Sequence, residues 1–150
     1  MWQPISEADL WEGINHGVRE MTLEQRRLWD IISVSPSKWM LPPWGDMGAG
    51  FWVVAIFGNT VIWFNDIEDG FNRSRYSRFG VIDAYWCNQD RLQWTIQCVL
   101  DEIRTGQPSG YFAGPPQPIA EPPDAMDSRS SPAVWIIFLA RAIDRGRSPN

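Results

Sequence analysis

The segment from Gly50 to Asn88 constrains the fold more than any other part of the chain, because it alternates short apolar runs with turn-forming residues. Three turn dipeptides separate the apolar runs, namely Gly58-Asn59, Asp69-Gly70 and Phe79-Gly80. Dipeptides of this kind between apolar runs are strong signals for β-hairpins. We therefore expect a meander of four short antiparallel strands, the last of which runs from Val81 to Trp86.

Each turn also predicts a register for its hairpin. A two-residue turn at Gly58-Asn59 pairs Ile56 with Val61, Val54 with Trp63 and Trp52 with Asn65. Both faces of that hairpin are apolar, so we expect it at the centre of the sheet with both faces covered. A two-residue turn at Asp69-Gly70 pairs Asp66 with Arg73, Phe64 with Arg75 and Trp63 with Tyr76. An ion pair and an aromatic pair across the strands stabilise this second register.

Two short helices are predicted before the meander. Ser6 opens an S-x-x-D sequence, which is a typical helix start, and Thr22 forms a capping box with Gln25 for the second helix. The second helix must end near Ser35, because the residue before Pro36 is disfavoured in a helical conformation.

The stretch from Ser35 to Gly50 is rich in proline, glycine and tryptophan and shows no periodicity. Such a composition is typical of a loop. We expect an ordered loop that Trp39 and Trp44 anchor by burying against the body of the domain.

A third helix is predicted after the meander, where Asp90 and Gln93 have the spacing of a helix start. The apolar residues that follow recur at helical spacing, at Leu92, Ile96, Val99, Leu100 and Ile103. This stripe predicts a helix packed on the sheet. The predicted fold class is therefore α+β, with two N-terminal helices, a four-stranded antiparallel meander, one helix on the sheet and a proline-rich C-terminal arm.

The sequence also suggests three regions. Residues 1–105 are predicted to form a single α+β domain. Residues 106–131 are predicted to be a proline-rich linker or arm, because seven of the twelve prolines lie between Pro108 and Pro132. Residues 132–150 hold a short apolar piece, Ala133 to Leu139, and a polar tail. We expect this piece to be a helix, with a strand as the alternative.

Composition restricts the class of partner. The net charge of −5 repels phosphate backbones, so we expect no nucleic-acid partner and favour a protein partner that is basic. The chain has ten tryptophans, and tryptophan is rarely buried completely. Some aromatic surface is therefore expected at a groove or an interface.

Targeting signals are also missing from the sequence. The N-terminal residues lack the charged and apolar regions of a secretory signal. The longest apolar run, Ala133 to Ala140, is shorter than the roughly 20 residues of a membrane span. We expect a soluble cytoplasmic protein without a membrane partner.

The residues that could act in catalysis or metal binding have simpler structural explanations. Asp66, Glu68 and Asp69 lack the spacing of a calcium loop, so we predict a structural acidic cluster and no metal site. Cys87 precedes the third helix, whose dipole can lower the pKa of a thiol, but a catalytic cysteine also needs a nearby base. The only histidine is His16, far away in the sequence. We therefore predict no catalytic residue, an unreactive Cys87 and no cofactor.

One face of the third helix lacks a structural explanation. Trp94, Cys98 and Asp101 follow one another at helical spacing on the side opposite the apolar stripe, and Glu102 adds a negative charge. Interfaces draw much of their binding energy from such aromatic anchors. We predict these four residues as partner-binding, together with Trp39 and Trp44 of the loop.

The GFWVVAI, VIWFNDIEDGFN and YWCNQD blocks resemble blocks in small uncharacterised bacterial proteins. The resemblance covers about residues 39–104 and implies neither a function nor a site residue.

We hypothesise a non-enzymatic protein-binding domain of the bacterial cytoplasm, most concretely an immunity- or antitoxin-like inhibitor. The alternative is a small enzyme that uses Cys87 or the acidic cluster together with His16. A cluster of His16 with Cys87 or Asp66 at a cleft would favour the enzyme. An exposed aromatic patch without that cluster would favour the binding protein. A homo-oligomer is compatible with either hypothesis.

Overall fold

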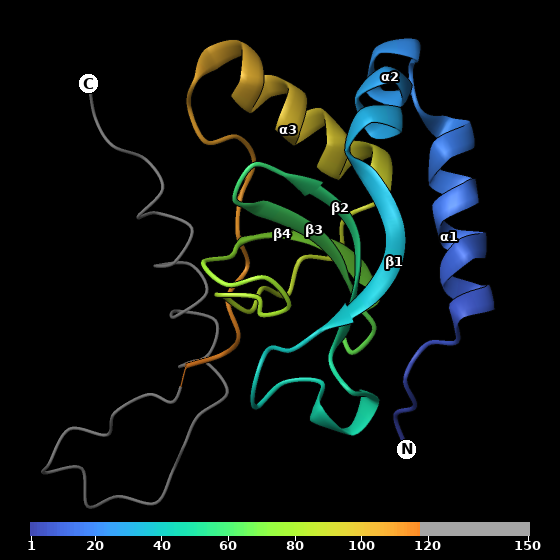
Figure 1. The fold of residues 1–150 in the computed structure, drawn as a ribbon, viewed down its shortest axis with the longest axis vertical. Coiled ribbons are helices and arrows are strands. Elements are labelled where there is room, and N and C mark those ends of the chain that lie inside the picture. The colour runs from blue at the N-terminus through green and yellow to red at the C-terminus, as the bar shows by residue number, and fades with distance from the viewer. Residues whose placement is uncertain (118–150) are drawn as a thin grey trace, which may run out of the picture. The chain divides into compact units, whose positions relative to one another are not determined.

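The computed structural model describes residues 1–117 and has an α+β fold, with helices packed on one face of a four-stranded antiparallel sheet (Figure 1). The helices are α1 (Glu7–Glu20), α2 (Leu23–Ile32) and α3 (Leu92–Thr105), with a short 3-10 helix at Asp46–Gly48. The strands are β1 (Ser33–Trp39), β2 (Phe51–Phe57), β3 (Thr60–Asn65) and β4 (Gly70–Arg75), in that order across the sheet. The predicted fold class is confirmed. Within the described residues, no helix is long and apolar enough to cross a membrane.

The two N-terminal helices begin where the sequence predicts. The Ser6 hydroxyl accepts a hydrogen bond from the backbone N–H of Asp9, at 3.1 Å. Thr22 and Gln25 form the complete capping box, in which each side chain accepts from the backbone N–H of the other residue. Helix α2 ends at Ile32 rather than near Ser35, because the chain passes directly into β1.

The start of α3 differs from the prediction. Arg91 is its N-cap and makes no side-chain capping bond, so the predicted role of Asp90 as the cap is wrong. The Asp90 carboxylate instead accepts from the side-chain amide of Asn88, at 2.8 Å, and its carbonyl accepts from the N–H of Phe71, at 2.9 Å. These contacts hold Asp90 against the edge of the sheet.

The four strands are not the four that the sequence predicts. The segment from Val81 to Trp86 makes only isolated bridges, whereas β1 arises from residues that were predicted as the end of a helix and the start of a loop. Strand β1 pairs with β2, with Trp39 opposite Phe51. Proline is tolerated at Pro36 because β1 is an edge strand and its pairing is irregular between Ser33 and Ser37.

The register of the first hairpin changes along its length. Ile56 faces Val61 as predicted, but Val53 rather than Val54 faces Trp63. The irregularity lies between Val53 and Ala55, so Val54 is the extra residue of a β-bulge. The bulge lets the consecutive residues Val54 and Ala55 both contribute to the core beneath the helices.

The second hairpin has a longer turn than predicted. Asn65 pairs with Gly70, so residues 66–69 form the turn and Phe64 faces Phe71. The Asn65 side-chain oxygen closes the turn by accepting from the backbone N–H groups of Ile67 and Glu68. The predicted two-residue turn and the register derived from it are therefore wrong.

The predicted ion pair between Asp66 and Arg73 is wrong for the same reason. The Asp66 carboxylate accepts from the backbone N–H of Ile5, at 2.8 Å. Arg73 is paired with Glu102 of α3 instead.

The sheet separates two hydrophobic cores. One lies beneath the helices and joins Leu10 of α1, Ile32 of α2 and Ile96 of α3 to β3 and β4. The other lies on the opposite face, which loops cover, and is centred on the fully buried Trp63. The Trp63 indole N–H donates to the hydroxyl of Ser74, at 2.9 Å. Both faces of β3 are thus buried, as its apolar sequence predicts.

The compact unit extends past the predicted boundary at residue 105 and reaches Pro116. Beyond α3, the chain returns to the sheet edge, where the N–H of Ala113 donates to the Asn88 side chain and its carbonyl accepts from the N–H of Cys87. Residues 106–116 therefore belong to the folded unit. The rest of the predicted arm and the apolar piece Ala133 to Leu139 lie outside the described residues.

Two glycine substitutions test this packing. A Cβ at Gly70 would lie 2.3 Å from the Cα of Gln89, whereas a Cβ at Gly13 of α1 would meet nothing within 4 Å. We expect Gly70→Ala to lower the free energy of unfolding by about 3 kcal/mol or more, because backbone cannot move aside as a side chain can. We expect Gly13→Ala to raise it by about 0.5–1 kcal/mol. Urea unfolding followed by circular dichroism measures both changes, and equal stabilities would contradict the close contact at Gly70.

Candidate functional site

The predicted partner-binding face of α3 is interrupted in the structure. Trp94 is 48% exposed, but Cys98 is only 2% exposed. The chain beyond α3 covers Cys98, since a Cβ at Gly110 would lie 2.9 Å from its sulfur. Asp101 is half-buried and accepts from the side chain of Gln97, at 2.9 Å. The prediction that Cys98 contacts a partner is therefore wrong, and Trp94 is left as a separate exposed aromatic residue.

Glu102 makes its contacts within the protein. Its carboxylate accepts from the guanidinium of Arg73, at 2.5 Å, and from the N–H of Ser109, at 3.2 Å. The same guanidinium donates to the carbonyl of Ser109 and lies 5.0 Å from the centre of the Phe112 ring. Because Arg73 is buried, these contacts satisfy a charge that would otherwise be costly to bury. Glu102 is thus a structural residue rather than the partner-facing acid that the sequence predicts.

The two loop tryptophans have different positions. Trp39 is 2% exposed and packs edge-on against Tyr76, so it anchors the loop as predicted but cannot contact a partner. Trp44 is stacked on Tyr85, with 4.2 Å between the ring centres, and 37% of it is exposed. The prediction that Trp39 binds a partner is therefore wrong. Trp44 both anchors the loop and reaches the surface.

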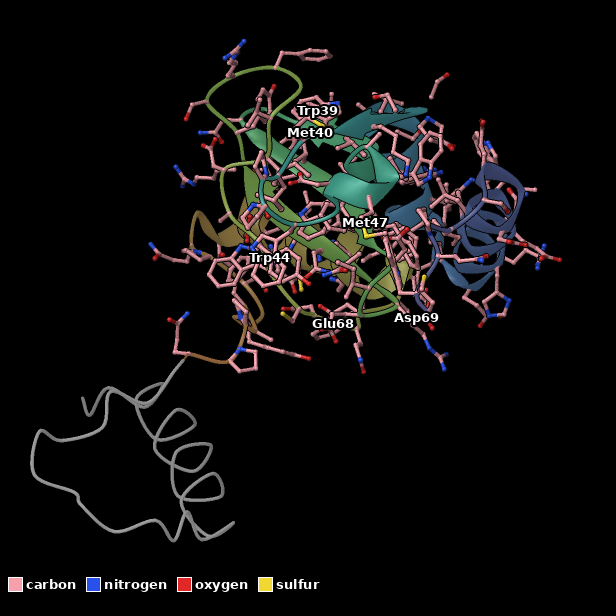
Figure 2. The ribbon with its side chains drawn as sticks, turned by 90° about the horizontal axis from the view of Figure 1, so that it is seen from below. Trp39, Met40, Trp44, Met47, Glu68 and Asp69 are labelled. Carbon is pink, nitrogen blue, oxygen red and sulfur yellow. The ribbon has the colours of Figure 1, made fainter. Side chains whose placement is uncertain are left out.

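The exposed part of this loop forms what we call the Met–Trp surface. It consists of Met40, Trp44 and Met47 together with the acidic residues Asp46, Glu68 and Asp69. Figure 2 shows the loop and the turn of residues 66–69 on the same end of the molecule, with Met47 between Trp44 and Asp69. Met47 is 83% exposed and is the most exposed apolar side chain of this surface.

The backbone beneath the Met–Trp surface is held by several contacts. The ammonium of Lys38 donates to the carbonyl of Gly48, at 2.8 Å, and lies 5.0 Å from the centre of the Trp52 ring. Burial lowers the pKa of Lys38, and the nearby Asp66 carboxylate opposes this effect. The N–H of Trp44 donates to the carbonyl of Leu41, at 2.8 Å. The exposed side chains thus stand on an ordered loop.

The acidic cluster is divided between two roles. The Asp66 carboxylate accepts a hydrogen bond from the backbone N–H of Ile5. The backbone carbonyl of Asp66 accepts from the indole N–H of Trp2, at 2.9 Å. Asp69 is exposed at the end of the turn, with a φ of 57°, and Glu68 is half-buried. Within residues 1–117, no group of three or more histidine, cysteine or acidic side chains is arranged to hold a metal ion.

The potential catalytic residues are on different sides of the sheet. Cys87 packs against the core centred on Trp63, whereas His16 is exposed on α1 and lines a small cavity of about 320 Å³ with Asp69 and Asp90. No hydrogen bond joins His16 to either acid in the described part of the chain. Burial and the Glu68 charge raise the pKa of Cys87, and burial raises the pKa of neighbouring Tyr85 to about 12. The arrangement that would activate a nucleophilic thiol is thus not formed by these groups.

Sequence reasoning missed the two methionines of the surface. Met40 and Met47 stand in the sequence MLPPWGDMG, in which the proline and glycine residues already indicate a turning loop. An apolar residue in such a loop can point inward or outward. Because the loop has no periodicity, its sequence does not tell buried apolar residues from exposed ones. Trp39 is buried against the rings of Tyr76 and Phe79, whereas Met47 lies in the short 3-10 helix with its side chain exposed.

Comparison of the chain with protein-family models, with curated proteins and with solved structures gives no match. The resemblance of the strand blocks to small bacterial proteins therefore stays a prediction.

The thiol chemistry of Cys87 is open to a direct test. In a Cys98→Ala chain, we expect alkylation of Cys87 to be slow at neutral pH and to rise with pH without levelling off below pH 9.0, the ordinary pKa of a thiol, because its own pKa is raised. The rate constant for iodoacetamide, measured against pH in the folded and the urea-unfolded chain, checks this. A rate that stays high and constant into the acidic range would indicate a stabilised thiolate and contradict the expectation.

Proposed function

We propose that this chain is a non-enzymatic protein-binding domain of the bacterial cytoplasm, and that the Met–Trp surface contacts a basic partner protein. The most concrete form of this proposal is an immunity- or antitoxin-like inhibitor. The observation that carries it is the exposure of Trp44 and Met47 on an ordered loop beside acidic side chains, with Met40 exposed at the start of the same loop.

The apolar part of the surface suits protein recognition. Methionine and tryptophan are enriched at protein interfaces, and methionine adapts its shape to an irregular partner. Trp44 is already fixed by its stack on Tyr85, so binding would cost little of its rotational freedom. A preorganised aromatic side chain next to an adaptable one, here Met47, is a favourable combination for a binding hot spot.

The acidic part of the surface determines the expected charge of the partner. Asp46 and Asp69 are exposed beside the apolar side chains, and the whole chain carries a net charge of −5. Negative groups at the rim of an interface steer a positively charged partner and reduce binding to acidic competitors. An inhibitor that covers a basic active site or nucleic-acid-binding surface would have this character.

The remaining predicted contact, Trp94, is a separate candidate. It lies on α3 with 48% of its surface exposed and is distant in sequence from the loop. Because its predicted neighbours Cys98 and Glu102 face the interior, Trp94 lacks the surrounding groups that the Met–Trp surface has.

In-cell photo-crosslinking tests the proposal with a matched control. Met47 and Ile31 of α2 are large apolar residues with similar exposed fractions, 83% and 80%, so a photo-crosslinking amino acid at either position is equally accessible. We expect position 47 to give an adduct of one discrete mass with a basic protein and position 31 to give none. Met47→Asp should prevent the adduct from a crosslinker at position 44, because it adds a charge to the apolar centre.

If the chain is an inhibitor, a second result is expected. The purified partner should lose its activity in the presence of the chain, and the Met47→Asp chain should inhibit it at least about tenfold less strongly, as expected for a hot-spot residue. Equal adducts from positions 47 and 31 would contradict the proposal that the partner contacts the Met–Trp surface. An adduct with a second copy of the chain would show an oligomer contact in place of a heterologous partner, and loss of the partner only in Trp94→Ala would move the site to α3.

A further inference from the structure

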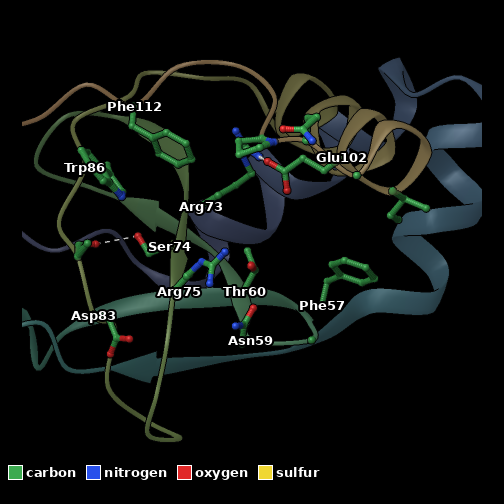
Figure 3. Close-up of a pocket in the computed structure, with 16 residues that line it drawn as sticks. Phe57, Asn59, Thr60, Arg73, Ser74, Arg75, Asp83, Trp86, Glu102 and Phe112 are labelled. Carbon is green, nitrogen blue, oxygen red and sulfur yellow. Dashed lines mark hydrogen bonds and ion pairs between the residues drawn. The ribbon is translucent and has the colours of Figure 1, made fainter.

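A second surface feature lies at the end of the sheet opposite the Met–Trp surface. It is a groove of about 880 Å³, whose floor includes Phe57 at the end of β2, Thr60 at the start of β3 and Arg75 at the end of β4 (Figure 3). The Met–Trp loop precedes the first residue of β2, whereas the groove begins at its last residue. The two sites therefore lie towards opposite ends of β2, although Tyr85, on which Trp44 stacks, stands in the chain between the groove residues Ala84 and Trp86.

The path of the chain after α3 explains why the groove is open. Gly106 ends the helix in a left-handed conformation, with a φ of 69°, and the chain then turns away towards Ser109. The end of the sheet is left without a helix above it, and Ile103 of the apolar stripe is 49% exposed. The last turn of α3 forms one wall of the groove, and Trp86 with Phe112 forms another. The rings of Trp86 and Phe112 are in contact, with 5.0 Å between their centres.

The two arginines in the groove differ in their electrostatic state. Arg73 is neutralised by Glu102 and fixed by the carbonyl of Ser109. Arg75 is exposed and takes part in none of the ion pairs formed within residues 1–117. The other acid at the groove, Asp83, accepts from the hydroxyl of Ser77, at 2.8 Å, and in Figure 3 it points away from the guanidinium of Arg75.

We propose that this groove binds a small organic acid, with its carboxylate on Arg75 and its flat apolar body between Phe57 and the Trp86–Phe112 wall. A guanidinium has a planar donor pattern that matches a carboxylate with two hydrogen bonds. The side chains of Asn59 and Thr60 also line the groove and can contribute further hydrogen bonds to the same group. The volume falls within the range of about 300–1,000 Å³ that is typical of small-molecule sites.

The apolar walls distinguish this ligand from a simple inorganic anion. Phosphate would contact Arg75 but would leave Phe57, Trp86 and Phe112 exposed to water. An aryl carboxylate covers these rings and neutralises the guanidinium at the same time. The inference goes beyond the proposed protein-binding function, because it concerns another site and requires no partner protein.

Nuclear magnetic resonance of the full chain tests the groove. The indole N–H signal of Trp86, assigned with a Trp86→Phe chain, reports on the aromatic wall. We use indole-3-acetate as the acid, indole-3-acetamide as its uncharged match and inorganic phosphate as the simple anion. We expect indole-3-acetate to shift the Trp86 signal with a sub-millimolar dissociation constant, the amide to bind about tenfold more weakly and phosphate to leave the signal unchanged.

Variants separate the groove from the general charge of the chain. Arg75→Gln removes the guanidinium in the groove that forms no ion pair within residues 1–117, and Arg78→Gln removes an exposed arginine outside the groove. We expect Arg75→Gln to weaken binding of indole-3-acetate about tenfold, Phe57→Ala to weaken it several-fold and Arg78→Gln to leave it unchanged. Thermal melting confirms that each chain is folded. The proposal is overturned if indole-3-acetate does not bind at millimolar concentration, if the amide binds equally well, or if Arg75→Gln and Arg78→Gln have the same effect.

Discussion

The reciprocal hydrogen bonds between Asn72 and Asn88 are the contact on which most of this structure depends. The side-chain oxygen of Asn72 accepts from the N–H of Asn88, at 2.8 Å, and its amide group donates to the carbonyl of Asn88, at 2.9 Å. Both residues are buried, so the amide satisfies backbone groups that would be costly to leave unpaired. The neighbouring Gly70 allows this segment to approach the sheet closely, because a side chain there would overlap the backbone of Gln89.

Two other regions are positioned by the same contact. The chain that leads to Asn88 covers the second core, where the hydroxyl of Ser74 joins the indole of Trp63 to the carbonyl of Ala84. The Asn88 side chain then holds the returning C-terminal segment through Tyr111 and Ala113. That segment in turn covers Cys98 and completes the surroundings of Arg73. One buried asparagine pair therefore links the sheet edge, the loop-covered face and the residues beyond α3.

The sheet thus presents two ends of different character. At one end, the stack of Trp44 on Tyr85 holds a loop whose methionines face solvent, and the acids of the β3–β4 turn lie beside it. At the other end, α3 stops before it covers the last residues of the strands, and Arg75, which forms no ion pair within residues 1–117, lies beside aromatic walls. The first arrangement suits a protein surface that is apolar and basic, whereas the second suits a small acid. Neither arrangement includes Cys87 or Cys98, and burial raises the pKa of both thiols.

The sequence by itself determined the features that depend on residues close together in the chain. The capping box joins Thr22 to Gln25, three positions further along, and the apolar runs of β2 and β3 follow directly from their composition. Only the tertiary structure decided the contacts between distant residues. Asp66 is tied to Ile5, 61 positions away, and not to its predicted strand partner, because the four-residue turn places Arg73 opposite Ile62 and leaves the Asp66 carboxylate to the N-terminal segment. The candidate sites belong to this second class, since the exposure of Met47 and Arg75 depends on which neighbouring segments cover each end of the sheet.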